Sequence, residues 1–94
     1  MLRQFQQLLA RKIEYDFGFA ERYAERHRKM AEKFGREYAE KLVSRGFLSG
    51  RIIDVGCGFG AMNIVLARRF VDSEIVGIDL SDPLLRLANR SAQA

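Results

Sequence analysis

The sequence RIIDVGCGFG, residues 51–60, places a short β-branched run directly before three closely spaced glycines. Gly50 and Gly56 bound the run, and its apolar residues are not arranged in helical spacing. Such a run is typical of a strand buried in a parallel sheet. Open α/β sheets bind ligands beyond the carboxyl ends of their strands, so the glycine segment stands where a ligand site is expected.

The residues after this run predict a second strand between two helices. Apolar residues at helical spacing follow the glycines from Met62 to Phe70, and a second strand-like run covers residues 74–78. A helix is expected over residues 83–89, with Ser81 or Asp82 as its cap and Pro83 in its first turn. A strand, a helix and a strand at this spacing predict a right-handed parallel crossover. We therefore expect an α/β fold with two parallel strands and flanking helices.

Two amphipathic helices are predicted before the first strand. Their apolar residues recur at three- and four-residue steps: Leu2, Phe5, Leu9 and Ile13 in the first, and Phe19, Tyr23, His27, Met30, Phe34, Tyr38 and Leu42 in the second. The second helix should end near Ser44 or Arg45, because Gly46 can take the left-handed cap conformation and Phe47 can fold back onto the last turn.

The aromatic stripe of the second helix is expected to be core, with His27 packed inside it. The alternative is that a tyrosine of this stripe closes over a cofactor. We divide the chain into an N-terminal helical segment, residues 1–46, and a sheet-containing unit, residues 47–94.

Composition limits the class of protein. The chain has 94 residues, 48% of them hydrophobic and 30% charged, which fits one small globular domain. Its single cysteine, Cys57, excludes an intrachain disulfide and a multi-cysteine zinc site, and suits a reducing compartment. No apolar run approaches the ~20 residues that span a bilayer. We expect a cytoplasmic protein without a metal.

The charge pattern bears on nucleic-acid binding. The formal net charge is +4, and most of the basic excess precedes Arg51. Five glutamates from Glu21 to Glu40 interleave with these basic residues, a pattern that favours a solvated helix face over a nucleic-acid surface. A non-catalytic module that binds RNA or a protein partner through this helix is kept as an alternative.

The glycine segment has a specific spacing. Gly56, Gly58 and Gly60 follow Asp54 as Gly-x-Gly-x-Gly, whose second gap is one residue shorter than in the dinucleotide fingerprint. With Asp54 before it, the string resembles the first motif of class I S-adenosylmethionine-dependent methyltransferases. The resemblance implies that this loop, Cys57 included, cradles the aminocarboxypropyl part of S-adenosylmethionine. Cys57 has no placed base, so we interpret its thiol as an apolar filler and not as a nucleophile.

An acidic residue ends the second predicted strand. Asp79 lies nineteen residues after Gly60, and a carboxylate at this position can accept hydrogen bonds from both hydroxyls of a ribose. The resemblance implies that Asp79 holds the ribose of S-adenosylmethionine and that Leu80 lies against the adenine. For Asp54, contact with the ammonium group of the cofactor and binding of neighbouring backbone amides both stay open. No residue is identified as a catalytic base.

The resemblance covers residues 47–94 and implies part of a Rossmann-like methyltransferase fold. A complete fold of this type has seven strands, so we expect the chain to hold the first half of the domain, to lack most of the pocket for a small-molecule methyl acceptor, and to be inactive alone. A nicotinamide-dependent oxidoreductase fragment is the alternative enzyme. We also expect a homo-oligomer that pairs through the edge of the strand Arg51 to Val55, because the second predicted strand covers only one of its two edges.

Overall fold

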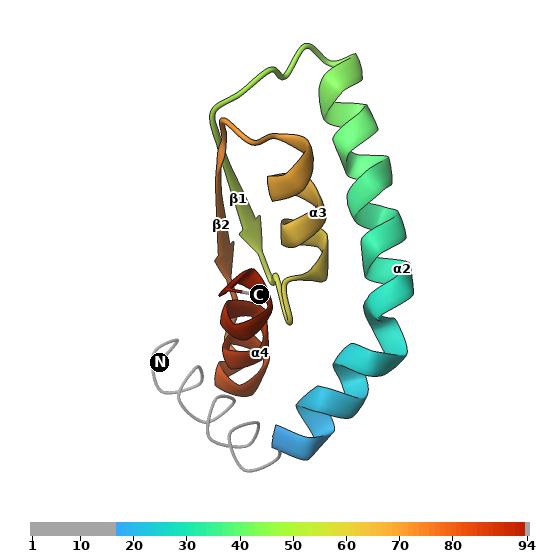
Figure 1. Ribbon diagram of the computed structural model, residues 1–94, viewed down its shortest axis with the longest axis vertical. Coiled ribbons are helices and arrows are strands. Elements are labelled where there is room, and N and C mark those ends of the chain that lie inside the picture. Colours follow the sequence, from blue (N-terminus) through green and yellow to red (C-terminus); the bar gives the residue numbers. More distant parts are fainter. Residues whose placement is uncertain (1–16, 94) are drawn as a thin grey trace, which may run out of the picture.

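A long helix lies beside a small α/β unit in the computed structural model, which describes residues 17–93 (Figure 1). The elements are α2 (Phe17–Ser44), β1 (Arg51–Val55), α3 (Ala61–Arg69), β2 (Glu74–Ile78) and α4 (Asp82–Gln93). The predicted α/β fold is confirmed, and so is the predicted order of elements from the second helix onward. The predicted helix with Leu2, Phe5, Leu9 and Ile13 lies outside the described residues.

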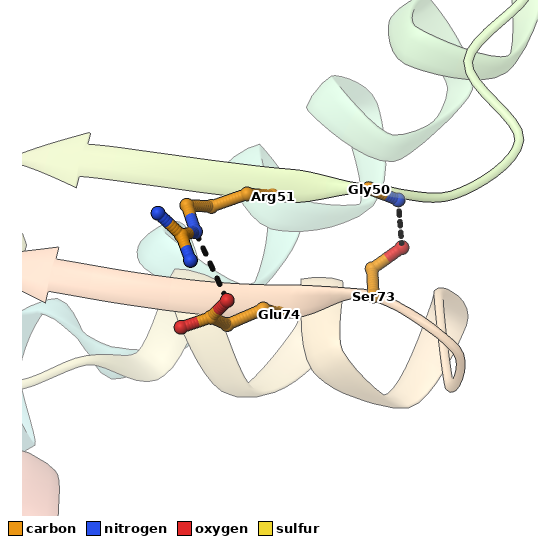
Figure 2. A network of polar contacts seen from close by, with 4 residues as sticks. All are labelled: Gly50, Arg51, Ser73 and Glu74. Carbon is orange, nitrogen blue, oxygen red and sulfur yellow. Dashed lines mark hydrogen bonds and ion pairs between the residues drawn. The ribbon is translucent and has the colours of Figure 1, made fainter.

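The two strands form a parallel pair in the register Arg51↔Glu74 to Val55↔Ile78. Figure 2 shows how the pair begins: the Gly50 N–H donates to Ser73 Oγ at 3.2 Å, and Arg51 Nε donates to Glu74 Oε2 at 2.9 Å. The Arg51–Glu74 pair is exposed to solvent, so it contributes little to stability. The backbone pairing, which continues in the bond from the Glu74 N–H to the Gly50 carbonyl, sets the register.

One face of the sheet is covered by helices. Ile52 and Ile75 pack against a buried cluster of Ala39, Leu66 and Phe70, so α3 lies between the strands and α2 (Figure 1). This cluster joins all three layers and fixes the position of α2 relative to the sheet.

The opposite face of the sheet is bare among residues 17–93. Ile53, Val55 and Ile78 are 55%, 81% and 51% exposed, and Ile53 and Val55 are aligned with Val76 and Ile78 across the pair. Parallel sheets usually have both faces covered. The side chains of Ile53, Val55, Val76 and Ile78 are called the bare face below.

The end of α2 has the predicted geometry. Gly46 has a φ of 89°, its N–H donates to the Val43 carbonyl at 3.0 Å, and the Phe47 N–H donates to the Leu42 carbonyl at 2.9 Å. These two bonds form a Schellman cap. Phe47 then packs edge-to-face on Phe70, with ring centroids 5.0 Å apart.

The face that α2 buries differs from the prediction. Its buried residues are small: Ala20, Ala24, Gly35 and Ala39. The predicted aromatic stripe is exposed, and so is His27, so both the core prediction for the stripe and the packed prediction for His27 are wrong. The reason is the close approach of the helices, since a Cβ added at Gly35 would lie only 2.9 Å from Val65 Cβ. Large side chains do not fit this seam and lie on its flank.

The start of α4 also follows the prediction. Ser81 is buried and its Oγ accepts a hydrogen bond from the Leu84 N–H at 3.3 Å, which makes it the cap, and Pro83 stands in the first turn. Leu84 and Leu87 then pack against a cluster that contains Phe59. Through these contacts α4 supports the glycine segment.

Candidate functional site

A cleft of about 330 Å³ opens between the glycine segment and α2. Asp54, Gly56, Gly58 and Asp79 line one side of it, at the carboxyl ends of the two strands. This is the edge of an α/β sheet at which ligands bind. Five residues of α2 line the other side: Tyr23, His27, Met30, Ala31 and Phe34.

Two of the glycines shape the cleft through their backbone conformation. Gly56 and Gly58 have φ values of 82° and 56°, in the left-handed region that side chains disfavour. A Cβ at Gly56 would meet nothing within 4 Å, and one at Gly58 would meet only Leu84 at 3.9 Å. Gly56 and Cys57 both donate their N–H to the Ile78 carbonyl, which ties the loop to the end of β2.

Gly60 has a different structural role from Gly56 and Gly58. Its φ is 77°, but a Cβ there would lie 2.9 Å from Ala88 Cβ of α4, and Gly60 does not line the cleft. The third glycine therefore permits close packing of α4.

Asp79, at the end of β2, is hydrogen-bonded to the glycine segment that follows β1. Its Oδ2 accepts a hydrogen bond from the Gly58 N–H at 2.8 Å, and its Oδ1 accepts one from the Ser81 N–H at 2.8 Å. A carboxylate has about four lone-pair positions, so about two remain for hydroxyl donors of a ligand. Asp79 therefore also braces the glycine segment. The sequence does not reveal this role, because no local signal reports a contact between residues as far apart in the chain as Gly58 and Asp79.

Asp54 is the second acidic group of the cleft. Its side chain is partly buried and makes no hydrogen bond with residues 17–93, so the alternative in which it binds neighbouring amides is not seen. Burial raises the pKa of the Asp54 carboxyl, and the nearby charge of Asp79 raises it further. A cation placed in the cleft would relieve this repulsion.

Cys57 belongs to the glycine segment, and its thiol lies next to Gly77 of β2. Burial raises the pKa of its thiol, and the charges of Asp79 and Asp54 act in the same direction. A Cβ at Gly77 would lie 2.7 Å from Cys57 Sγ, so the thiol fills the space above β2 that this glycine leaves. A thiol that keeps its proton is a poor nucleophile, in agreement with its interpretation as a filler.

The structure brings five of the seven predicted site residues to the cleft: Asp54, Gly56, Cys57, Gly58 and Asp79. Gly60 and Leu80 do not line it, and Leu80 is exposed. The hydrophobic pattern of α2 predicts a core position for its aromatic side chains, and only the alternative, a tyrosine that closes over a cofactor, places one of them at the site.

Two kinds of feature are absent from residues 17–93. These residues contain no group of three or more His, Cys, Asp or Glu side chains placed to hold a metal ion. In the same range, no helix combines the length and the apolar composition that crossing a bilayer requires.

Known proteins resemble the segment that contains Asp54 and Asp79, the two acidic residues of the cleft. Residues 52–94 match the family described as "Methyltransferase domain". The chain is also 39% identical over 46 residues to the uncharacterized protein YbxB of Bacillus subtilis (strain 168), a stretch that covers 49% of this chain and 23% of that protein. The chain thus spans less than a quarter of this relative's length. No solved structure gives a significant match.

Proposed function

Because residues 52–94 carry a methyltransferase domain match, which confirms the resemblance seen in the sequence, we propose that the chain binds S-adenosylmethionine in the cleft and acts in methyl transfer. One observation supports this most: the hydrogen bond from the Gly58 N–H to Asp79 Oδ2. It joins the glycine segment and the acidic residue of the second strand into one binding surface.

The residues of the cleft suit this cofactor. The open backbone at Gly56 and Gly58 leaves room for the amino-acid part, and the unused lone pairs of Asp79 can accept hydrogen bonds from ribose hydroxyls. Asp54, without a hydrogen-bond partner among the described residues, suits the positively charged groups of the cofactor. When bound, the cofactor supplies the methyl group. The chain binds it and orients it.

The charge of the cleft disfavours the nicotinamide alternative. A dinucleotide carries a pyrophosphate, and the described lining holds Asp54 and Asp79 but no lysine or arginine. Two carboxylates near a pyrophosphate would repel it. The glycine spacing and the charge therefore both support S-adenosylmethionine.

Titration calorimetry with S-adenosylmethionine tests the proposal. Asp79→Asn removes the negative charge and should weaken binding by about 1.5–3 kcal/mol, roughly 10- to 150-fold, as for the loss of hydrogen bonds to a charged group. Asp72→Asn removes the same charge from an exposed residue that does not line the cleft, and should leave the affinity unchanged. Tighter binding of NAD⁺ than of S-adenosylmethionine, or equal effects of the two substitutions, would contradict the proposal.

A cytoplasmic location and the inactivity of the 94-residue chain by itself remain predictions. Activity with a labelled methyl donor and a broad panel of acceptors would test the second.

A further inference from the structure

We propose that the flank of α2 formed by Tyr23, His27, Met30 and Phe34, the aromatic wall, binds the methyl acceptor, and that this acceptor is a small, flat molecule without negative charge. The identification of the ligand as an acceptor rests on the proposed function. The surface itself rests on the position, exposure and surroundings of these four side chains.

The aromatic wall is an exposed apolar surface beside a hollow. Its members follow one another at steps of four, three and four residues, so they form one flank of α2 next to the seam of small residues. Tyr23, Met30 and Phe34 are 40–52% exposed, although large apolar side chains usually contribute to a core. Apolar surface that lines a concave site is typical of ligand binding.

Aromatic contacts join this wall to the glycine segment. The Tyr23 ring lies edge-to-face on the Phe59 ring, with centroids 6.1 Å apart, and 4.4 Å from the His27 ring. Phe59 is buried and stands between Gly58 and Gly60 in the chain. The wall is therefore anchored against the loop that we assign to the cofactor, and aromatic faces favour flat partners. The thioether of Met30 can adapt to the outline of a ligand.

The charges of the cleft restrict the acceptor further. Asp54 and Asp79 face the same hollow, and no lysine or arginine is among its described lining residues. Phosphorylated, carboxylated or nucleic-acid acceptors would be repelled by these carboxylates. A neutral flat molecule is accepted, and a cationic one gains from both the carboxylates and the aromatic faces.

The arrangement also meets the geometric need of methyl transfer. The donor and the acceptor must be held opposite each other so that the attack is in line. The glycine segment and Asp79 hold one side of the cleft, and the aromatic wall lies on the other. The wall is thus placed to hold the acceptor across from the cofactor.

Three probes of one shape and different charge test the inference: benzylamine, benzyl alcohol and benzoate. Each is titrated by NMR into the 94-residue chain saturated with S-adenosylhomocysteine. We expect benzylamine and benzyl alcohol to shift the signals of Tyr23 and Phe34, with benzylamine binding more tightly, and benzoate to cause no saturable shift.

A pair of matched variants locates the binding. Phe34 and Tyr38 are aromatic, lie one turn apart on α2 and are 44% and 51% exposed, but only Phe34 lines the cleft. Phe34→Leu should weaken benzylamine binding at least threefold, and Tyr38→Leu should not change it. Circular dichroism of both variants shows whether each is folded, and Tyr23→Leu gives a second test within the wall.

The outcomes separate this inference from the proposed function. Equal effects of Phe34→Leu and Tyr38→Leu, or benzoate binding as tight as that of benzylamine, would overturn the inference. If benzylamine shifts the signals of Tyr23 and Phe34 only in the chain without S-adenosylhomocysteine, and not in the saturated chain, the wall belongs to the cofactor, which also overturns the inference while the proposed function stands. If S-adenosylhomocysteine does not bind at all, the proposed function fails, and the acceptor assignment fails with it whatever the probes do.

Discussion

Replacing Gly35 with alanine should destabilise the chain, although alanine is the better helix former. The added Cβ would lie 2.9 Å from Val65 Cβ and 3.2 Å from the Met62 carbonyl oxygen. Carbon atoms pack best at about 3.5–4.0 Å, so α2 and α3 would have to separate by roughly 0.6–1.1 Å. Such overpacking costs about 1–3 kcal/mol, and the gain in helix propensity offsets about 1 kcal/mol.

The net loss should therefore be up to about 2 kcal/mol, with a fall in Tm of about 4–8 °C for each kcal/mol in a domain of this size. Thermal and urea unfolding followed by circular dichroism measure it. Gly18→Ala is the matched control, because Gly18 is an exposed glycine of the same helix and should gain stability or stay unchanged. If Gly35→Ala stabilises the chain as much as Gly18→Ala does, the close seam between α2 and α3 is wrong.

Two further predictions concern the acidic cleft and β1, the strand that contributes Ile53 to the bare face. The pKa of Asp54 is raised in the folded chain, so ionisation of this carboxyl opposes folding. The free energy of unfolding should therefore fall as the pH rises from 3.8 through the raised pKa. Asp54→Asn should remove this pH dependence in urea unfolding and raise stability at neutral pH while weakening S-adenosylmethionine binding; a variant that is less stable at pH 7 would contradict this. We also expect two copies of the chain to pair through the edge of β1 that no strand within residues 17–93 covers, so sedimentation at several concentrations should show a dimer that Ile53→Lys dissociates without unfolding the chain. A folded monomer at high concentration would exclude this dimer.

The sequence was sufficient to predict features that depend on local signals. The glycines around residues 51–55 mark the ends of β1, and the Gly46–Phe47 pair marks the end of α2, because turn and cap conformations require particular residues at particular positions. Asp54 and Asp79 lie at the same end of the sheet because the strands are parallel, so that their carboxyl ends are adjacent.

The buried face of α2 could not be predicted in this way. Its hydrophobic pattern favours the aromatic stripe, but the distance between α2 and α3 decides which side chains fit, and that distance depends on Gly35 meeting Val65. The partners of Asp79 also depend on tertiary structure, since Gly58 and Ser81 reach its two oxygens only when the loop and the start of α4 are in place.

The most direct test of the cleft as the cofactor site is an NMR titration of the isotopically labelled chain with S-adenosylmethionine. The backbone amides of Gly56, Gly58 and Ser81 should shift together along one saturable curve, since they surround Asp79. The amides of Arg36 and Arg68, which line a separate hollow between α2 and α3, should not move. Shifts confined to Arg36 and Arg68, or no saturable shift at Gly58, would contradict the account.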